Sequence, residues 1–274
     1  MFEKLKKHAR LLIRKIELAR ELNRMKKCPN QTVQNILKAF LAVRSNTYNQ
    51  DDKEAFERCE NYRNALLKRS EKVSFEIFGL DDEKTMGEIC SKAASPKIWC
   101  QFLYMLAKKS ASQNMLEIGT NLGISGSYLL EATAHNHKSK LITMEGVSQL
   151  CNISSRRFSE ITNLDRFEIV EGLYQDTFPK ILKNPVLFDM HFIDGNHQQE
   201  ATLEYFMKLK EKTRQQTVFI FDDINWSKGM KKAWKTIQND KSVLFSIDLW
   251  KLGIVITNPS NAGKPTGFKL FLSF

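Results

Sequence analysis

The stretch Asn114-Met-Leu-Glu-Ile-Gly-Thr-Asn-Leu-Gly-Ile-Ser-Gly126 decides the predicted fold of this 274-residue chain. Residues 115–118 are expected to form a short buried strand, and residues 125–134 have the spacing of a helix. Gly119 and Gly123 predict a sharp turn between them. A strand, a glycine turn and a helix start in this order are typical of the nucleotide-facing corner of a doubly wound α/β sheet, where a ligand approaches the backbone closely.

The glycine spacing alone does not decide between a binding turn and an ordinary one. The sequence has the pattern E-x-G-x-x-x-G, whereas dinucleotide enzymes have G-x-G-x-x-G. A plain tight turn explains this spacing about as well. The functional interpretation therefore depends on the strands that follow.

Strands and helices alternate after this corner, which is the pattern of a parallel sheet. The expected strands lie at 115–118, 140–144, 167–171, 189–193 and 217–221, and the expected helices at 125–134, 148–161, 175–182, 199–211 and 227–238. The alternation then stops, and three strand-like segments without helices between them predict an antiparallel edge: Val243–Trp250, Gly253–Thr257 and Phe268–Phe274. We predict a Rossmann-like α/β fold, doubly wound and mostly parallel, with an antiparallel C-terminal edge.

A helical extension is expected before the sheet. Residues 2–26 have the apolar spacing of an amphipathic helix, and further helices are expected at 32–44, 51–72 and 96–109. We divide the chain into a basic helical extension, residues 1–78, and a sheet domain, residues 79–274. Residues 1–27 carry seven of the chain's eleven net positive charges. A helical cap or homodimer element explains this helix best; an anionic membrane surface or a nucleic acid is an alternative that fewer features support.

Composition indicates a globular cytoplasmic protein. Hydrophobic residues make up 42% and charged residues 27% of the chain, as in ordinary globular domains. No apolar run is long enough to span a bilayer, and no secretory signal is evident at the N-terminus. The five cysteines are scattered and form no C-x-x-C pair, which argues against a disulfide framework or a zinc knuckle.

Polar residues follow the expected strands at the sheet edge where ligands bind in such folds. Glu145-Gly146 ends the second strand at about the distance from the glycine turn at which a carboxylate binds ribose hydroxyls. A solvated turn acid is the alternative. Gly172 and Leu173 end the third strand, where they could line an adenine edge or form an ordinary loop.

Acidic residues end the fourth and fifth strands. Asp194 and His197 follow one strand, and Asp222-Asp223 follow the other. Three carboxylates at one rim repel each other unless a cation lies among them, and all-oxygen ligands suit Mg²⁺. Alternatively, one acid caps a helix and the others are solvated. His197 is a candidate general base, metal ligand or structural hydrogen-bonding residue, since histidine ordinarily titrates near ~6.5.

Together, these motifs resemble class I S-adenosylmethionine-dependent methyltransferases, and most of all the small-molecule O-methyltransferases related to catechol O-methyltransferase. The resemblance covers about residues 90–274. It implies S-adenosylmethionine as cofactor, a small-molecule hydroxyl acceptor, catalytic roles for Asp194 and His197, and a divalent ion such as Mg²⁺ on Asp194, Asp222 and Asp223. The implied cofactor-binding residues are Glu117, Gly119, Thr120, Asn121, Gly123, Ser125, Glu145, Gly146, Gly172, Leu173 and Asp194.

Two departures from the family pattern are evident. An Asp-Asn pair is usual where this chain has Asp222-Asp223, and the family's catalytic lysine position is taken by His197. The mechanism implied is direct displacement of a methyl group by an aligned hydroxyl oxygen, with His197 as a candidate proton acceptor. An RNA ribose methyltransferase and a non-catalytic cofactor-binding module that contacts a partner or a membrane surface stay open as alternatives.

Overall fold

The computed structural model describes residues 2–213, 215–260 and 263–272, with side chains from residue 14 onward. An eight-stranded sheet forms its centre, in the order β10-β8-β9-β7-β6-β3-β4-β5. Five strands of this sheet are mutually parallel and confirm the predicted ones to within one residue at either end. They are β3 (Asn114–Ile118), β4 (Lys140–Glu145), β5 (Phe167–Glu171), β6 (Met190–Ile193) and β7 (Thr217–Phe221).

The C-terminal edge differs in part from the prediction. β9 (Gly253–Thr257) is antiparallel to both β7 and β8 (Val243–Asp248), as expected. β10 (Thr266–Lys269) pairs with β8 in parallel, so an entirely antiparallel edge was wrong. The chain leaves β9 near the start of β8 and begins β10 there, on the outer side of β8, which makes β10 run in the direction of β8. Residues 273–274 of the predicted last strand lie outside the described residues.

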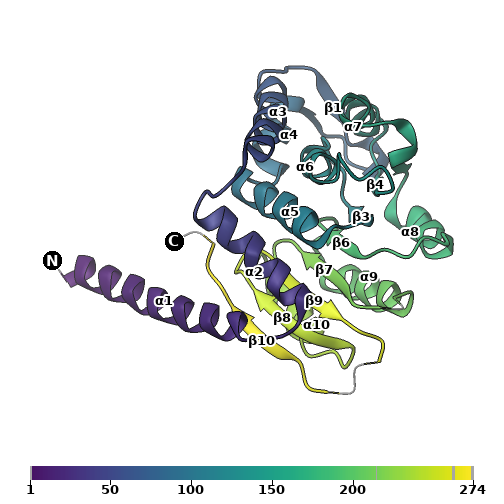
Figure 1. Ribbon diagram of the computed structural model, residues 1–274. Helices are drawn as coiled ribbons and strands as arrows, with labels where there is room; N and C mark the ends of the chain where they lie inside the picture. Colours follow the sequence, from purple (N-terminus) through teal and green to yellow (C-terminus); the bar gives the residue numbers. More distant parts are fainter. Residues whose placement is uncertain (1, 214, 261–262, 273–274) are drawn as a thin grey trace.

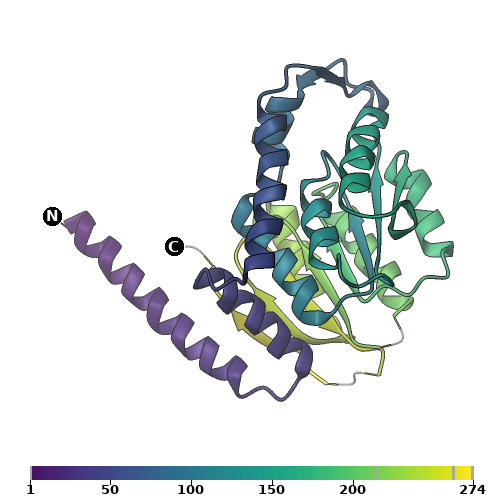
Figure 2. The ribbon, with the colours of Figure 1, turned by 45° about the horizontal axis from the view of Figure 1, so that its top comes forward.

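Helices cover both faces of the sheet because alternate residues of each buried strand point to opposite sides. Met115 belongs to one hydrophobic core and Leu116 to the other. One face packs against α5, α6 and α7, and the other against α8, α9 and α10 (Figures 1 and 2). These helices are α5 (Lys97–Ser110), α6 (Ile124–Ala132), α7 (Ser148–Ile161), α8 (Tyr174–Lys183), α9 (Gln199–Glu211) and α10 (Lys228–Ile237), with a short 3₁₀ turn η2 (Leu164–Arg166) before β5.

The N-terminal helices pack on the sheet domain to different extents. α2 (Gln31–Arg44) and α3 (Gln50–Leu67) contribute buried side chains to the same core as α5 and α6. The C-terminal half of α1 (Phe2–Lys26) places Leu18 and Met25 in this core and contacts α2 and β10, whereas its N-terminal half extends away from the body (Figures 1 and 2). The division at residue 78 stays a prediction, although α2 and α3 share the core of the sheet domain.

The segment between α3 and α5 contains elements that the sequence did not indicate. α3 ends at Leu67 and not near residue 72, because residues 72–74 pair as a strand. β1 (Lys72–Ser74) and β2 (Glu83–Thr85) form an antiparallel hairpin around the 3₁₀ turn η1 (Glu76–Phe78). α4 (Met86–Ala93) follows, and Thr85 and Glu88 close its first turn as a capping box.

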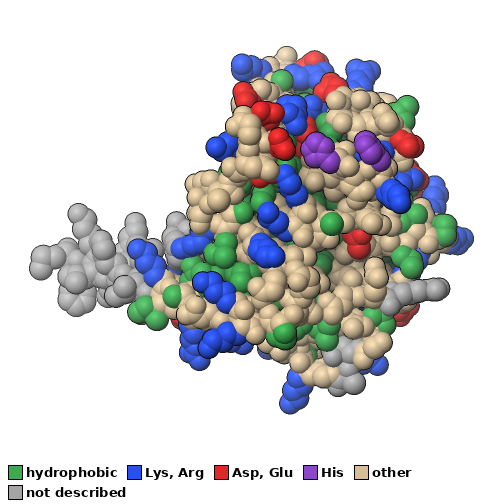
Figure 3. Space-filling view, viewed as in Figure 1, with side chains coloured by type: hydrophobic (Ala, Val, Ile, Leu, Met, Phe, Trp, Pro, Cys, Tyr) green, Lys and Arg blue, Asp and Glu red, His purple; other side chains and the backbone are tan. Residues whose placement is uncertain are grey.

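The surface charge and the hydropathy of the helices are relevant to the alternative partners, a nucleic acid or a membrane. On the face shown in Figure 3, Lys and Arg side chains are interspersed with acidic, apolar and uncharged ones. Across the described ranges, no helix combines the length and apolar character needed to cross a membrane. The cytoplasmic location and the homodimer stay predictions.

Candidate functional site

The glycine turn after β3 is fixed by close backbone contacts. Gly119 has φ +108°, and a Cβ atom placed there would lie 2.4 Å from the carbonyl oxygen of Asp194. Gly123 has φ +70° and is the N-cap of α6. The backbone of β3 therefore passes directly against the end of β6, which only glycine allows. β3 and β6 pair directly in the sheet, and the glycine lets the chain turn at this close contact.

Glu117 is buried beneath this turn and does not line the cavity. Its side chain accepts hydrogen bonds from Ser125 Oγ at 2.6 Å and Thr143 Oγ1 at 2.8 Å. Burial raises the pKa of Glu117 to about 7, although these two hydrogen bonds oppose the shift. Glu117 thus links α6 to β4 beneath the turn and stabilises it.

Glu145 reaches the cavity from the end of β4. Its carboxylate accepts hydrogen bonds from the backbone N–H groups of Asn121 at 2.8 Å and Val147 at 2.9 Å. Burial raises the pKa of Glu145, and its backbone hydrogen bonds partly offset this. The backbone holds the carboxylate at the cavity wall, and a carboxylate has further lone pairs for ligand hydroxyls.

Another cavity, of about 500 Å³, adjoins the one that Glu145 lines, and Tyr174 lines both. Leu173 and Phe78 also line it, and the Phe78 ring lies against Gly146, where an added Cβ would be 3.0 Å from Phe78 Cζ. Burial raises the pKa of Tyr174 well above its ordinary value, so the phenol is neutral. Phe78 and Tyr174 had not been predicted as site residues.

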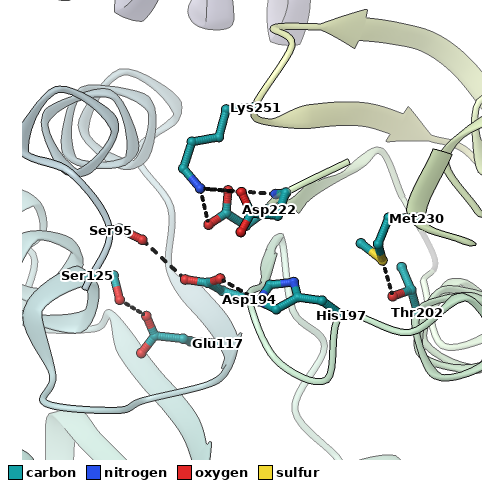
Figure 4. A network of polar contacts seen from close by, with 10 residues as sticks. Ser95, Glu117, Ser125, Asp194, His197, Thr202, Asp222, Met230 and Lys251 are labelled. Carbon is teal, nitrogen blue, oxygen red and sulfur yellow. Dashed lines mark hydrogen bonds and ion pairs between the residues drawn. The ribbon is translucent and has the colours of Figure 1, made fainter. Parts of the chain in front are cut away.

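Asp194 and His197 lie together at the end of β6 (Figure 4). His197 Nε2 is 3.6 Å from Asp194 Oδ1, and Ser95 Oγ donates a hydrogen bond of 3.2 Å to Asp194 Oδ2. Burial and the negative charge of Asp222 raise the pKa of Asp194 well above its ordinary range. His197 lies beside Asp194, with a third of its side chain exposed.

Lys251 is the functional candidate that sequence reasoning missed. Its Nζ lies 2.7 Å from Asp222 Oδ1 and 2.7 Å from Asp223 Oδ1, between the two carboxylates (Figure 4). Burial alone would lower the pKa of Lys251, but Asp222 and Asp223 raise it above its ordinary value. The mutual repulsion expected for this acid pair was a signal that a cation belongs there.

One cavity of about 540 Å³ joins most of the predicted residues with unpredicted neighbours. Glu117, Gly123, Gly146 and Gly172 lie outside its lining, and Leu173 lines the adjoining cavity instead. The predicted residues that line it are Gly119, Thr120, Asn121, Ser125, Glu145, Asp194, His197, Asp222 and Asp223. The other lining residues are the segment 91–96, Leu122, Ile124, Tyr174, Trp226 and Lys251.

The predicted divalent-ion site fits poorly with this geometry. The structure describes no group of three or more His, Cys, Asp and Glu side chains arranged to hold a metal ion. Two of the three expected ligands, Asp222 and Asp223, are paired with Lys251 instead. The third, Asp194, accepts a hydrogen bond from Ser95 Oγ at 3.2 Å.

Part of the chain is similar to known methyltransferases. Residues 116–224 match a family model described as a methyltransferase domain. The chain is 24% identical over 159 residues to O-methyltransferase hkm8 from Aspergillus hancockii, a match covering 57% of this chain and 61% of hkm8. It is 26% identical over 125 residues to a catechol O-methyltransferase from Niastella koreensis, a match covering 45% of this chain and 55% of that protein. The chain thus spans little more than half the length of these relatives.

A solved structure shares the fold. The O-methyltransferase from Bacillus cereus, crystallised in complex with SAH, superposes with a TM-score of 0.52 at 22% identity. The superposition covers 61% of this chain and 83% of that one. The resemblance to the class I methyltransferases, predicted from sequence, is confirmed.

Proposed function

We propose that this chain, which carries a class I S-adenosylmethionine-dependent methyltransferase domain, transfers a methyl group to a hydroxyl oxygen of a small molecule. The observation that carries the proposal is the cavity of about 540 Å³ at the strand ends. It joins the glycine turn and Glu145 on one side to Asp194 and His197 on the other. A cofactor site and a proton acceptor thus face the same space.

The glycine-turn side is suited to the cofactor. Gly119, Thr120 and Asn121 line the cavity with little side-chain bulk, and Glu145 is held at its wall by backbone N–H groups. We assign Glu145 to the ribose hydroxyls, because its two oxygens can accept both hydroxyl protons. When bound, S-adenosylmethionine supplies a methyl group on a positively charged sulfur.

The Asp194 side is suited to the acceptor. His197 Nε2 faces Asp194, which leaves the other ring nitrogen, Nδ1, to accept the proton of the acceptor hydroxyl. Asp194, whose Oδ1 lies 3.6 Å from Nε2, positions the imidazole ring for this role. The chain's contribution is to hold the acceptor oxygen in line with the transferred methyl group and to exclude water.

No step of this mechanism passes through a divalent ion, because the residues predicted to hold it are engaged by Lys251 and Ser95. The basic α1 helix is assigned no role in the reaction. Its proposed homodimer contact would use the part of α1 that extends beyond β10 (Figure 2).

A turnover experiment tests the function. The protein is incubated with methyl-labelled S-adenosylmethionine and a panel of hydroxylated small molecules, and labelled product is measured. We expect His197→Ala to lower turnover by about 10²-fold or more, the usual contribution of a positioned base, while S-adenosylhomocysteine affinity stays close to wild type. His135→Ala, a substitution in the loop between α6 and β4, is the matched control. Turnover unchanged by His197→Ala would remove His197 from the mechanism.

A further inference from the structure

The turn between β8 and β9 places a lysine, Lys251, in the lining of the cavity. Lys251 lies two residues before β9, and only 23% of its side chain is exposed. Its ammonium group contacts Asp222 at 2.7 and 2.8 Å and Asp223 at 2.7 Å. Both carboxylates follow β7, the strand that β9 pairs with.

Backbone contacts hold this lysine in place. The Ile224 N–H donates to the Lys251 carbonyl at 3.2 Å, and Asn225 Nδ2 donates to the Trp250 carbonyl at 2.7 Å. The turn that carries the lysine is thus tied to the residues that immediately follow the acid pair. The fold therefore positions the backbone from which the ammonium group reaches the acids.

The ammonium occupies the space that a divalent ion would need. Mg²⁺ binds carboxylate oxygens at about 2.0–2.1 Å and keeps an octahedral shell of further ligands. A nitrogen 2.7 Å from oxygens of both Asp222 and Asp223 leaves no room for that shell on the same oxygens. Two positive groups sharing these oxygens would also repel each other strongly at such short separation.

We propose that Lys251 takes the place of a divalent cation in this site, so that the chain holds Asp222 and Asp223 and positions its acceptor without a metal. This inference rests on the proposed function for its meaning in catalysis. Lys251 is then a positioning residue. An acceptor then needs no pair of neighbouring oxygens to chelate an ion, so the site admits acceptors that present a single hydroxyl group.

The test is ion binding in the absence of the lysine charge. Mn²⁺ is titrated into wild-type protein and into Lys251→Met, and free Mn²⁺ is followed by electron paramagnetic resonance. We expect wild type to bind no Mn²⁺ at the acid pair. Lys251→Met should bind it at least about tenfold more tightly, because a unit positive charge in contact with both carboxylates has been removed. Lys251→Met/Asp223→Asn should lose this gain, which places the ion at the acid pair.

A second buried ion pair provides the matched control. Lys210 Nζ lies 2.5 Å from Asp240 Oδ2, and the two side chains are 15% and 11% exposed. Lys210→Met removes the same charge from a similarly buried pair that has one carboxylate, so it should gain no Mn²⁺ binding. Thermal unfolding of each variant establishes that it is folded.

Two results would overturn the inference. One is Mn²⁺ binding to wild-type protein that Asp223→Asn removes, since the ion would then displace the lysine; this comparison decides the matter even if Lys251→Met does not fold. The other is a folded Lys251→Met variant that gains no Mn²⁺ binding. S-adenosylhomocysteine is titrated into the same samples: if no sample binds it while Lys251→Met gains Mn²⁺, the proposed function fails and the assignment of Lys251 as the cation stands.

Discussion

The two sides of the central cavity hold their carboxylates in different ways. On the side of β3 and β4, backbone N–H groups of Asn121 and Val147 hold Glu145. On the side of β6 and β7, the side chain of Lys251 holds Asp222 and Asp223. Lys251 lies almost thirty residues further along the chain, in the turn between β8 and β9. The first side is built by local chain geometry, and the second by a tertiary contact.

The difference explains what each side can do. A carboxylate held by backbone groups keeps its position whatever the surrounding side chains are, which suits a constant ligand such as a cofactor. Carboxylates held by one side chain can be altered by a single substitution, which suits an acceptor that differs between related enzymes. We therefore expect substitutions on the first side to disturb fold and cofactor binding, and those on the second to disturb acceptor handling.

The largest effect is expected for Gly119→Ala. The added Cβ would lie 2.4 Å from the Asp194 carbonyl oxygen at φ +108°, so the strand ends must separate. We expect a loss of about 3 kcal/mol or more in the free energy of unfolding, measured by urea denaturation, together with loss of S-adenosylhomocysteine binding. Gly79→Ala is the control: Gly79 has φ +70° but no atom within 4 Å of an added Cβ, so it should cost only about 1 kcal/mol. Equal losses of unfolding free energy in the two variants would show that the contact of residue 119 with the Asp194 carbonyl does not matter.

A smaller effect is expected for Glu145→Gln. Asn121 and Val147 donate to different oxygens of Glu145, so glutamine keeps an acceptor for one of them and places its NH₂ group against the other. It also loses the charge and one acceptor for the ribose hydroxyls. S-adenosylhomocysteine affinity, measured by calorimetry, should fall about 10- to 100-fold, the size of a hydrogen bond to a charged group. The melting temperature should also fall, because one backbone N–H loses its acceptor. Glu171→Gln, at the exposed position paired with Glu145 across β4 and β5, should leave affinity unchanged. A similar loss for both variants would count against the ribose assignment.

The smallest effect is expected in how the free energy of unfolding depends on pH. Burial lowers the pKa of His191 on β6 to about 3 and raises that of Glu117 on β3 to about 7. Between pH 5 and 6 the unfolded chain takes up a proton at His191 that the folded chain does not, so this residue makes stability fall as pH falls. Glu117 acts oppositely, because the folded chain keeps a proton that the unfolded chain loses, so its contribution is lost as pH rises.

Two variants separate these contributions. Relative to wild type, His191→Leu should change the slope of unfolding free energy against pH by about −1.4 kcal/mol per unit, and Glu117→Gln by about +1.4. Urea denaturation at pH 5.0, 5.5 and 6.0 gives both slopes. Slopes that match wild type in both variants would show that neither group is perturbed by the fold.

The sheet and the cofactor side could be predicted because their signals are local. Buried parallel strands are continuous apolar runs, and the glycine turn and Glu145 follow strand ends directly. The hairpin β1–β2 was missed because its strands are only three residues long. Thr85 and Glu88 do form a readable capping box, which could have predicted α4.

The acceptor side could be predicted only in part. The sequence indicated that Asp222 and Asp223 need a positive partner, but it did not specify which one. Lys251 follows Trp250 in a turn and has no local feature that distinguishes it from a surface lysine. Only the pairing of β9 with β7 brings it to the acids, and such pairings of distant segments leave no periodic mark in the sequence.

The most direct test of the account is calorimetric titration of metal-free protein with S-adenosylhomocysteine, with EDTA present throughout. We predict binding of one molecule per chain, weakened by Glu145→Gln and unchanged when Mg²⁺ replaces EDTA. Absence of binding to folded protein would contradict the methyltransferase assignment. Binding that appears only with Mg²⁺ would contradict the metal-free site built around Lys251.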